Sequence, residues 1–157
     1  DGNEFIEAPD IEQIAEMLRE RHNLPVEPTF RFLWKAKGGK KGGAAKRGWC
    51  QKLSGPAKHF AGGAEFLVWL AADTCRDAKY TQEQYVALVF HELNFAGVDY
   101  DDDGNPTMVM RHVDFEGFLD EIRCYGLWED NLAEFARVAE QAPLWGGEVM
   151  PEAADCP

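Results

Sequence analysis

The chain has 157 residues, of which 45% are hydrophobic and 12% aromatic, which is typical of one soluble domain with a substantial core. Its acidic amino terminus lacks the basic and apolar regions of a signal peptide, and no apolar run approaches the roughly 20 residues that cross a bilayer, so we expect a cytoplasmic protein. The net charge of −12 argues against nonspecific attraction of the whole molecule to nucleic acid or to an anionic membrane.

The first part of the chain predicts a helix followed by a strand. Apolar residues recur at helical spacing from Ile11 to Leu18. Asp10 stands just before them and is a suitable N-cap, so we expect a helix over residues 11–21. Two prolines interrupt the pattern, and residues 30–37 (FRFLWKAK) then have the composition of a strand.

A strongly basic segment follows this strand. Between Lys35 and Lys58 the chain carries eight basic residues and no acidic one. The glycine-rich residues 38–43 predict a hairpin whose returning strand runs from Arg47 to Leu53. The hairpin is either a solvated, flexible loop or a contact for a phosphate group or an acidic protein. The residues that would bind such a nucleic-acid or protein partner are Lys40, Lys41, Lys46 and Arg47.

A buried strand and a well-marked helix come next. Residues 65–72 (EFLVWLAA) form a short, almost entirely apolar run, as expected of a buried strand. Thr81 begins the helix, because Gln84 stands three residues later and completes a capping box. The helix continues through YVALVFHELNF and should stop near Gly97. Together these elements predict an α+β fold with a small, mostly antiparallel sheet.

The predicted helix contains His91 and Glu92, the opening pair of the zinc-peptidase motif H-E-x-x-H. Phe95 stands one turn after His91, where the motif has its second histidine. That spacing normally places two imidazoles side by side on one zinc ion, while the glutamate polarises a water molecule. A phenyl ring has no lone pair, so the motif is degenerate. The alternative is that His91 is an ordinary hydrogen-bonded residue on a half-buried helix face.

An acidic segment follows this helix. Residues 99–104 match the start of a calcium-binding EF-hand loop, in which position twelve is a bidentate glutamate. Met110 stands at that position, so we expect a solvated D-G-N-P turn instead of a calcium site. A short strand over residues 108–110 is predicted after the turn.

Two further helices are expected near the end of the chain. Asp114 is the predicted N-cap of the first, which ends at Gly126 and turns Phe115, Phe118, Leu119 and Ile122 inward. The second covers residues 130–141 and stops before a proline. We therefore expect a single domain whose core spans about residues 10–142, followed by an acidic tail over residues 143–157.

The order of these segments resembles the phage metallopeptidase family, a compact group similar to SprT-like and other minimal zinc peptidases. The resemblance runs from about Phe30 to Trp128. It rests on three matching stretches, which are FHEL at residues 90–93, RHVDFEGF at residues 111–118 and YGLW at residues 125–128. The fold that it implies is zincin-like, with the H-E helix packed on the sheet between N- and C-terminal helices.

The resemblance also implies a set of site residues. Such a family holds zinc through two histidines of the motif helix and a third side chain downstream, with the glutamate as general base. Carried over, His91 is a metal ligand, Glu92 is the catalytic base and His112 is the downstream ligand. Asp114 is either its competitor or its hydrogen-bonding partner. Phe95 cannot ligate, so this zinc site lacks one ligand.

Three explanations of the missing ligand remain open. The chain is a natural pseudoenzyme that keeps the fold to bind a partner, or it carries an engineered inactivating change. Alternatively, Asp99, Asp114 or Glu116 substitutes for the missing ligand in an active zinc-dependent peptidase that cleaves a protein substrate. The non-enzymatic form would be a phage interaction protein that binds a host protein, or nucleic acid through the basic hairpin, in the host cytoplasm.

Overall fold

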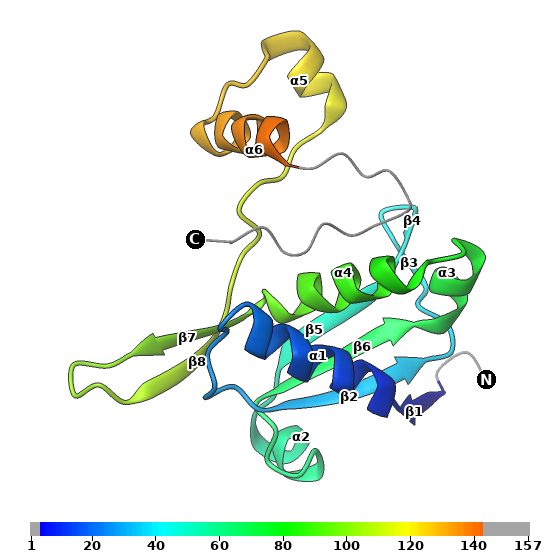
Figure 1. Ribbon diagram of the computed structural model, residues 1–157, viewed down its shortest axis with the longest axis vertical. Helices are drawn as coiled ribbons and strands as arrows, with labels where there is room; N and C mark the ends of the chain where they lie inside the picture. Colours follow the sequence, from blue (N-terminus) through cyan, green and yellow to red (C-terminus); the bar gives the residue numbers. More distant parts are fainter. Residues whose placement is uncertain (1–3, 143–157) are drawn as a thin grey trace. The chain divides into compact units, whose positions relative to one another are not determined.

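The computed structural model describes residues 4–142 (Figure 1). Two compact units make up the chain, Asp1–Arg111 and His112–Pro157. The expectation of a single domain stays a prediction, and the expected acidic tail, residues 143–157, lies outside the described residues. Within residues 4–142, every helix is too short or too polar to cross a bilayer.

The first unit is built around a four-stranded sheet in the order β1-β2-β6-β5. Its strands are β1 (Phe5–Glu7), β2 (Phe30–Lys35), β6 (Phe66–Ala71) and β5 (Gly48–Lys52). The two outer pairs are antiparallel, whereas β2 and β6 run parallel, with Phe32 opposite Val68. The α+β class predicted from the sequence is confirmed.

The basic segment does not bring β5 back beside β2, so the predicted hairpin is wrong. β5 pairs with β6, with Cys50 opposite Val68, and β6 separates β5 from β2. Only the glycine-rich tip forms a hairpin, between β3 (Lys40–Lys41) and β4 (Ala44–Ala45). The physical reason is that β6, which comes later in the sequence, is apolar on both faces and is buried best at the centre of the sheet.

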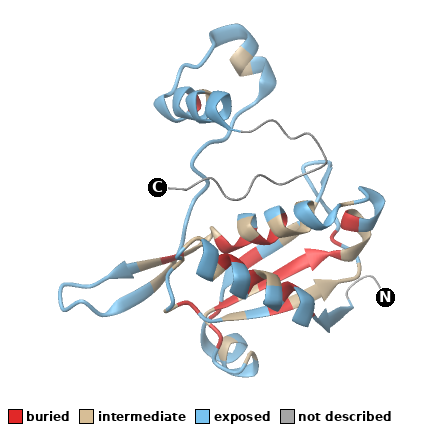
Figure 2. Cartoon of the chain, viewed as in Figure 1, coloured by how far each residue is buried: buried red, intermediate tan, exposed pale blue. Residues whose placement is uncertain are grey.

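Two helices, α1 (Pro9–Arg21) and α4 (Gln82–Leu93), cover one face of this sheet (Figure 1). Figure 2 shows that burial is concentrated on the central strands and on the helix sides that face them. Each fully buried aliphatic side chain there contributes roughly 1.5–3 kcal/mol to folding. The core beneath the helices includes Ile11, Ala15, Leu18, Phe32, Cys50, Phe66, Val68, Leu70, Leu88, Val89 and Leu93. Two short helices, α2 (Gly55–Phe60) and α3 (Ala72–Asp77), flank β6 in the chain.

The two covering helices begin differently. α1 starts at Pro9 without a capping side chain, so the predicted cap by Asp10 is wrong. Asp10 lies in the first turn, where its carboxylate accepts a hydrogen bond from the indole of Trp34 at 3.0 Å. The capping box of α4 is confirmed, because Thr81 accepts from the Gln84 N–H at 3.3 Å and the Gln84 side chain accepts from the Thr81 N–H at 2.9 Å. Proline at the first helical position explains why α1 needs no such cap.

Helix α4 ends at Leu93, before the predicted stop at Gly97. Gly97 lies in β7 (Ala96–Tyr100), which pairs with β8 (Pro106–Met110) across the predicted D-G-N-P turn. A Cβ atom at Gly97 would stand 2.8 Å from the side chain of Arg111. The glycine is therefore needed for close packing in this hairpin and does not cap the helix.

The second unit contains α5 (Leu119–Tyr125) and α6 (Asp130–Gln141). α6 has the predicted bounds. α5 begins five residues after Asp114, so the predicted cap by Asp114 is wrong, and the Glu121 carboxylate instead accepts a hydrogen bond from the Phe118 N–H. Phe118 and Leu119, which were predicted to point inward, are exposed, so that prediction is wrong. In the described part of this unit, Leu132 is the buried hydrophobic residue.

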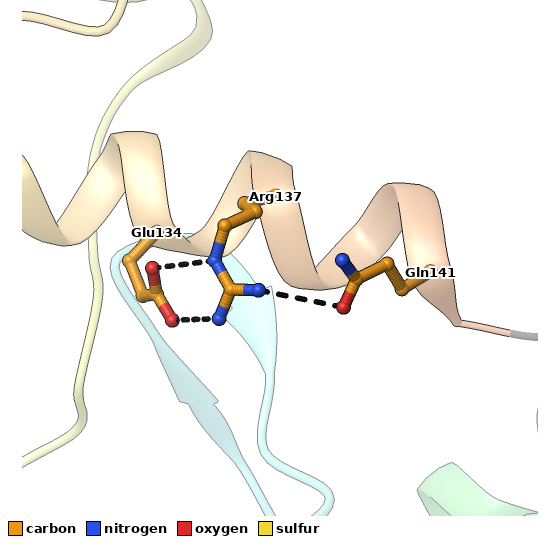
Figure 3. A network of polar contacts seen from close by, with 3 residues as sticks. All are labelled: Glu134, Arg137 and Gln141. Carbon is orange, nitrogen blue, oxygen red and sulfur yellow. Dashed lines mark hydrogen bonds and ion pairs between the residues drawn. The ribbon is translucent and has the colours of Figure 1, made fainter.

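Helix α6 carries an exposed polar network on its surface (Figure 3). Arg137 donates two hydrogen bonds to the carboxylate of Glu134, one of them from Nε at 2.9 Å. A further nitrogen of the same guanidinium reaches the Gln141 side-chain oxygen at 3.4 Å. Pairs three and four residues apart on a helix support it locally, but water and salt screen this exposed network.

Candidate metal centre

Helix α4 places His91 and Glu92 on neighbouring directions of its surface, about 100° apart around the axis. Their surroundings differ sharply. The Glu92 side chain is only 4% exposed, whereas His91 belongs to the exposed class of residues. The glutamate therefore faces the sheet and the imidazole lies at the edge of the covered region.

The carboxylate of Glu92 packs against the backbone of β5. A Cβ atom built on Gly48 would lie 2.7 Å from Oε1 of Glu92, so a larger residue at that point of the strand would displace the carboxylate. Burial raises the pKa of the Glu92 carboxyl to about 7, and the positive charge of Arg47 offsets part of that rise. Burial also raises the pKa of the nearby Cys50 thiol to about 12, with a smaller contribution from Glu92. On the β5 side, the Glu92 carboxyl group is thus surrounded by the protonated thiol of Cys50 and by the backbone of Gly48.

The imidazole of His91 contacts the ring of Phe95, which lies in the turn just after the end of α4. The two ring centroids lie 5.3 Å apart with an interplanar angle of 87°, an edge-to-face contact. Phe95 is partly buried and packs against the hydrophobic core of the first unit. Desolvation lowers the pKa of His91, and Arg47 lowers it further, so the imidazole is neutral near pH 7 and has a nitrogen lone pair to offer.

These side chains do not fit a catalytic zinc site. Such a site uses three protein ligands and keeps a fourth position for water. The Phe95 ring packs against His91 and supplies no lone pair. Over residues 4–142, no three His, Cys, Asp or Glu side chains form a group that could hold a metal ion.

A family model described as "putative phage metallopeptidase" matches residues 3–141. The chain belongs to this family. The match covers α4 and both of the downstream stretches on which the sequence resemblance rests, and membership of a metallopeptidase family indicates a metal. No curated protein and no solved structure matches the chain.

The downstream ligand candidates of this family member are His112 and Asp114, which lie in the second unit. His112 is exposed, and its Nδ1 donates a hydrogen bond to the Val113 carbonyl at 2.9 Å. That bond fixes the tautomer in which Nε2 carries the lone pair, as a metal-binding histidine requires. Asp114 and Glu116 are exposed in the segment before α5, and Asp99 is exposed on β7 in the first unit.

The four basic residues predicted to bind a partner have different surroundings. The ammonium groups of Lys41 and Lys46 lie over the ring of Trp49, and Lys40 is exposed on β3. Arg47 acts electrostatically on both His91 and Glu92 and so belongs to the surroundings of α4.

Two features of this centre were not predicted, namely the role of Arg47 and the glycine beneath Glu92. No sequence signal marks Gly48, because its importance depends on which strand residue lies under the helix. Arg47 could have been singled out only as the residue preceding that glycine.

Proposed function

We propose that this member of the phage metallopeptidase family keeps a zincin-like fold but binds a host protein without hydrolysing it. The observation that carries the proposal is the contact of the Phe95 ring with His91, where a second imidazole is expected. Mutation of a residue that hydrogen-bonds to a metal ligand typically lowers metal affinity 10- to 100-fold. Removal of one of the three ligands themselves should lower it at least as much. The proposed place of action is the cytoplasm of the infected host.

The surroundings of Phe95 and Glu92 support the same proposal. Phe95 packs against the hydrophobic core, so its ring has a structural role that an imidazole would fill poorly. Glu92 is buried against Gly48, which limits its access to a water molecule outside the helix. Phe95 therefore contributes to the core, and Glu92 is poorly placed to activate a water molecule, which suits a binding protein.

Metal content tests this proposal directly. Protein purified without chelators, and then dialysed against zinc, is expected to hold less than about one zinc per ten chains, because two strong ligands are not enough. The Phe95→His variant should bind zinc about 10- to 100-fold more tightly than the parent. Elemental analysis together with titration by a zinc-sensitive dye measures both quantities.

The matched control is the double variant Phe95→His/His91→Ala, which restores one imidazole while removing the other. It should lose the zinc gained by Phe95→His if the two residues act together. Stoichiometric zinc in the parent chain would overturn the degenerate-site proposal.

One observation favours a second candidate function, an active zinc-dependent peptidase. Burial raises the pKa of Glu92 to about 7, which is close to the optimum for a general base at neutral pH. Such an enzyme would use His112 as its downstream ligand, and Asp99, Asp114 or Glu116 would have to substitute for the ligand missing at Phe95. Casein hydrolysis by the parent and by Glu92→Gln separates the two functions. Activity that falls at least about 100-fold in Glu92→Gln supports the enzyme, and no activity in either protein supports the binding function.

A further inference from the structure

The sheet face opposite α1 and α4 carries aromatic side chains. Successive side chains of a strand alternate between the two faces. Phe32, Cys50 and Val68 point into the core beneath the helices. Trp49 and Trp69 therefore point to the opposite face, and the strand register sets these two residues directly across from each other.

Three aromatic rings lie on this side of the sheet, those of Phe5, Trp49 and Trp69. We call this surface the aromatic face. Phe5 is 45% exposed and Trp49 is 37% exposed. Trp69 lies on β6, between the strands that carry the other two, and is 7% exposed. The centroids of Phe5 and Trp69 are 6.5 Å apart in an edge-to-face contact. The aromatic face thus has two accessible rings supported by a buried one.

Lysine ammonium groups lie over these rings. Nζ of Lys35 is 4.8 Å from the centroid of the Trp69 ring. Nζ of Lys46 and of Lys41 lie 4.7 Å and 5.9 Å from the centroid of the Trp49 ring. Such cation–π contacts are individually weak at exposed sites, and lysine side chains are flexible. A stronger anionic partner can therefore draw the ammonium groups away and expose the rings.

The charge of the aromatic face is opposite in sign to that of the whole chain. Glu7 is the acidic residue among the strand residues on this side, and its carboxylate is paired with Arg31 at 2.5 Å. Lys35, Lys41 and Lys46 add three positive charges that contact rings instead of carboxylates. The chain as a whole has a net charge of −12. Positive charge next to stackable rings is thus concentrated on one side of the sheet.

We propose that the aromatic face binds single-stranded nucleic acid, with bases stacked on Trp49 and Phe5 and phosphates held by Lys35, Lys41 and Lys46. Base stacking on aromatic side chains and lysine contacts to phosphates are the two recurring elements of sequence-independent single-strand binding. A duplex hides the faces of its bases and is the poorer ligand. An acidic peptide would match the lysines but would leave the rings without partners. This inference does not depend on the proposed loss of peptidase activity.

Fluorescence anisotropy with labelled oligothymidine of about 20 nucleotides tests the inference. The full chain should bind at about 50 mM salt with a dissociation constant of 10⁻⁶–10⁻⁴ M, in the range of nonspecific nucleic-acid binding. Trp49→Ala should weaken binding about 5- to 150-fold, as expected for the loss of one stacked base. Lys41→Ala/Lys46→Ala should lower the slope of log K against log salt by about 1.4, because each phosphate contact contributes about 0.7.

Matched controls separate the aromatic face from general surface effects. Phe60→Ala removes an 85% exposed ring on α2, and Lys52→Ala removes a charge from the side of β5 that faces the helices. Both should bind like the parent. Trp49→Phe should retain most of the affinity and the thermal stability, which distinguishes stacking from misfolding.

Three results would overturn the inference. The first is no binding of the parent chain at about 50 mM salt. The second is equal loss in Trp49→Ala and Phe60→Ala, or in the double lysine variant and Lys52→Ala. The third is equal or stronger competition by polyglutamate or by a duplex of the same length, which would assign the aromatic face to an acidic protein or to double-stranded DNA. Parallel competition by oligouridine shows whether the sugar is discriminated.

Discussion

Glu92 shows how one buried side chain links the fold of this family member to its chemistry. The carboxyl group is 4% exposed and lies over the backbone of Gly48. The same burial that raises its pKa to about 7 makes the ionised form costly in the folded protein. Ionisation of the buried Glu92 carboxyl is therefore a source of instability as pH rises.

The stability of the first unit should consequently fall as pH rises through the range in which Glu92 ionises. Its pKa is about 7 in the folded state and ordinarily 4.5, so between those values the folded chain binds more protons than the unfolded chain. The contribution is fully favourable below about pH 4.5 and is lost by pH 7, a change of about 3 kcal/mol. Urea unfolding of the parent and of Glu92→Gln should diverge by that amount over this range, with Glu92→Gln relatively more stable at high pH.

His91 has the opposite dependence, because its lowered pKa makes stability fall as pH drops below the ordinary value of 6.5. This dependence is present in both proteins and cancels in the comparison. Glu83→Gln, which removes an exposed carboxylate from the same helix, is the control. A constant free-energy difference between parent and Glu92→Gln across pH would contradict the assigned role of burial.

At the scale of single elements, α4 holds the candidate centre and is the element whose local sequence is most consistent with its structure. Its capping box begins the helix at the predicted place, and Leu88, Val89 and Leu93 bury its inner side in the core. α4 should therefore be sensitive both to its cap and to its packing. The cap can be changed without touching the core.

Thr81→Ala is expected to lower the free energy of unfolding by about 1 kcal/mol, because the Gln84 N–H loses its side-chain acceptor. Ser54→Ala offers a matched control at the N-cap of α2, where the serine side chain makes no capping hydrogen bond. It should change stability by only a few tenths of a kcal/mol. Urea denaturation followed by tryptophan fluorescence measures both changes, and equal effects would count against the capping box as a source of stability.

At the scale of the whole molecule, the hydrophobic core cluster formed by residues 4–142 lies in the first unit. Every member of the core cluster lies between Ala8 and Met108. In the second unit, the described large apolar residues include several that are mostly exposed, namely Phe118, Leu119 and Tyr125. The first unit thus buries enough apolar surface for a stable fold without the second unit.

A fragment that ends at Arg111 should fold on its own. It keeps all four strands of the sheet together with α1 and α4, so we expect near-UV circular dichroism and a cooperative urea transition similar to those of the parent. A fragment that ends at Tyr80 lacks α4 and should not fold cooperatively. If the fragment ending at Arg111 exposed its apolar surface and bound a hydrophobic dye, the independence of this core would be refuted.

Sequence patterns were reliable where local interactions decide the structure. The capping box of α4, the bounds of α6 and the apolar strand β6 follow from hydrogen bonds or periodicity within a few residues. The three-residue strand β1 has no such signal, because only pairing with β2 makes it a strand. The predicted caps at Asp10 and Asp114 were wrong, since nearby proline and glutamate residues satisfy these helix starts differently.

The sequence by itself determined the α+β class, the H-E helix and the absence of a ligand at Phe95, because these depend on residue identity and helical spacing. Only the tertiary structure decided that β6 separates β2 from β5, which places the Trp49 and Trp69 rings opposite each other on one side of the sheet. It also decided that Glu92 is buried over β5. Strand order and burial arise from contacts between residues far apart in the chain, and no local pattern encodes them.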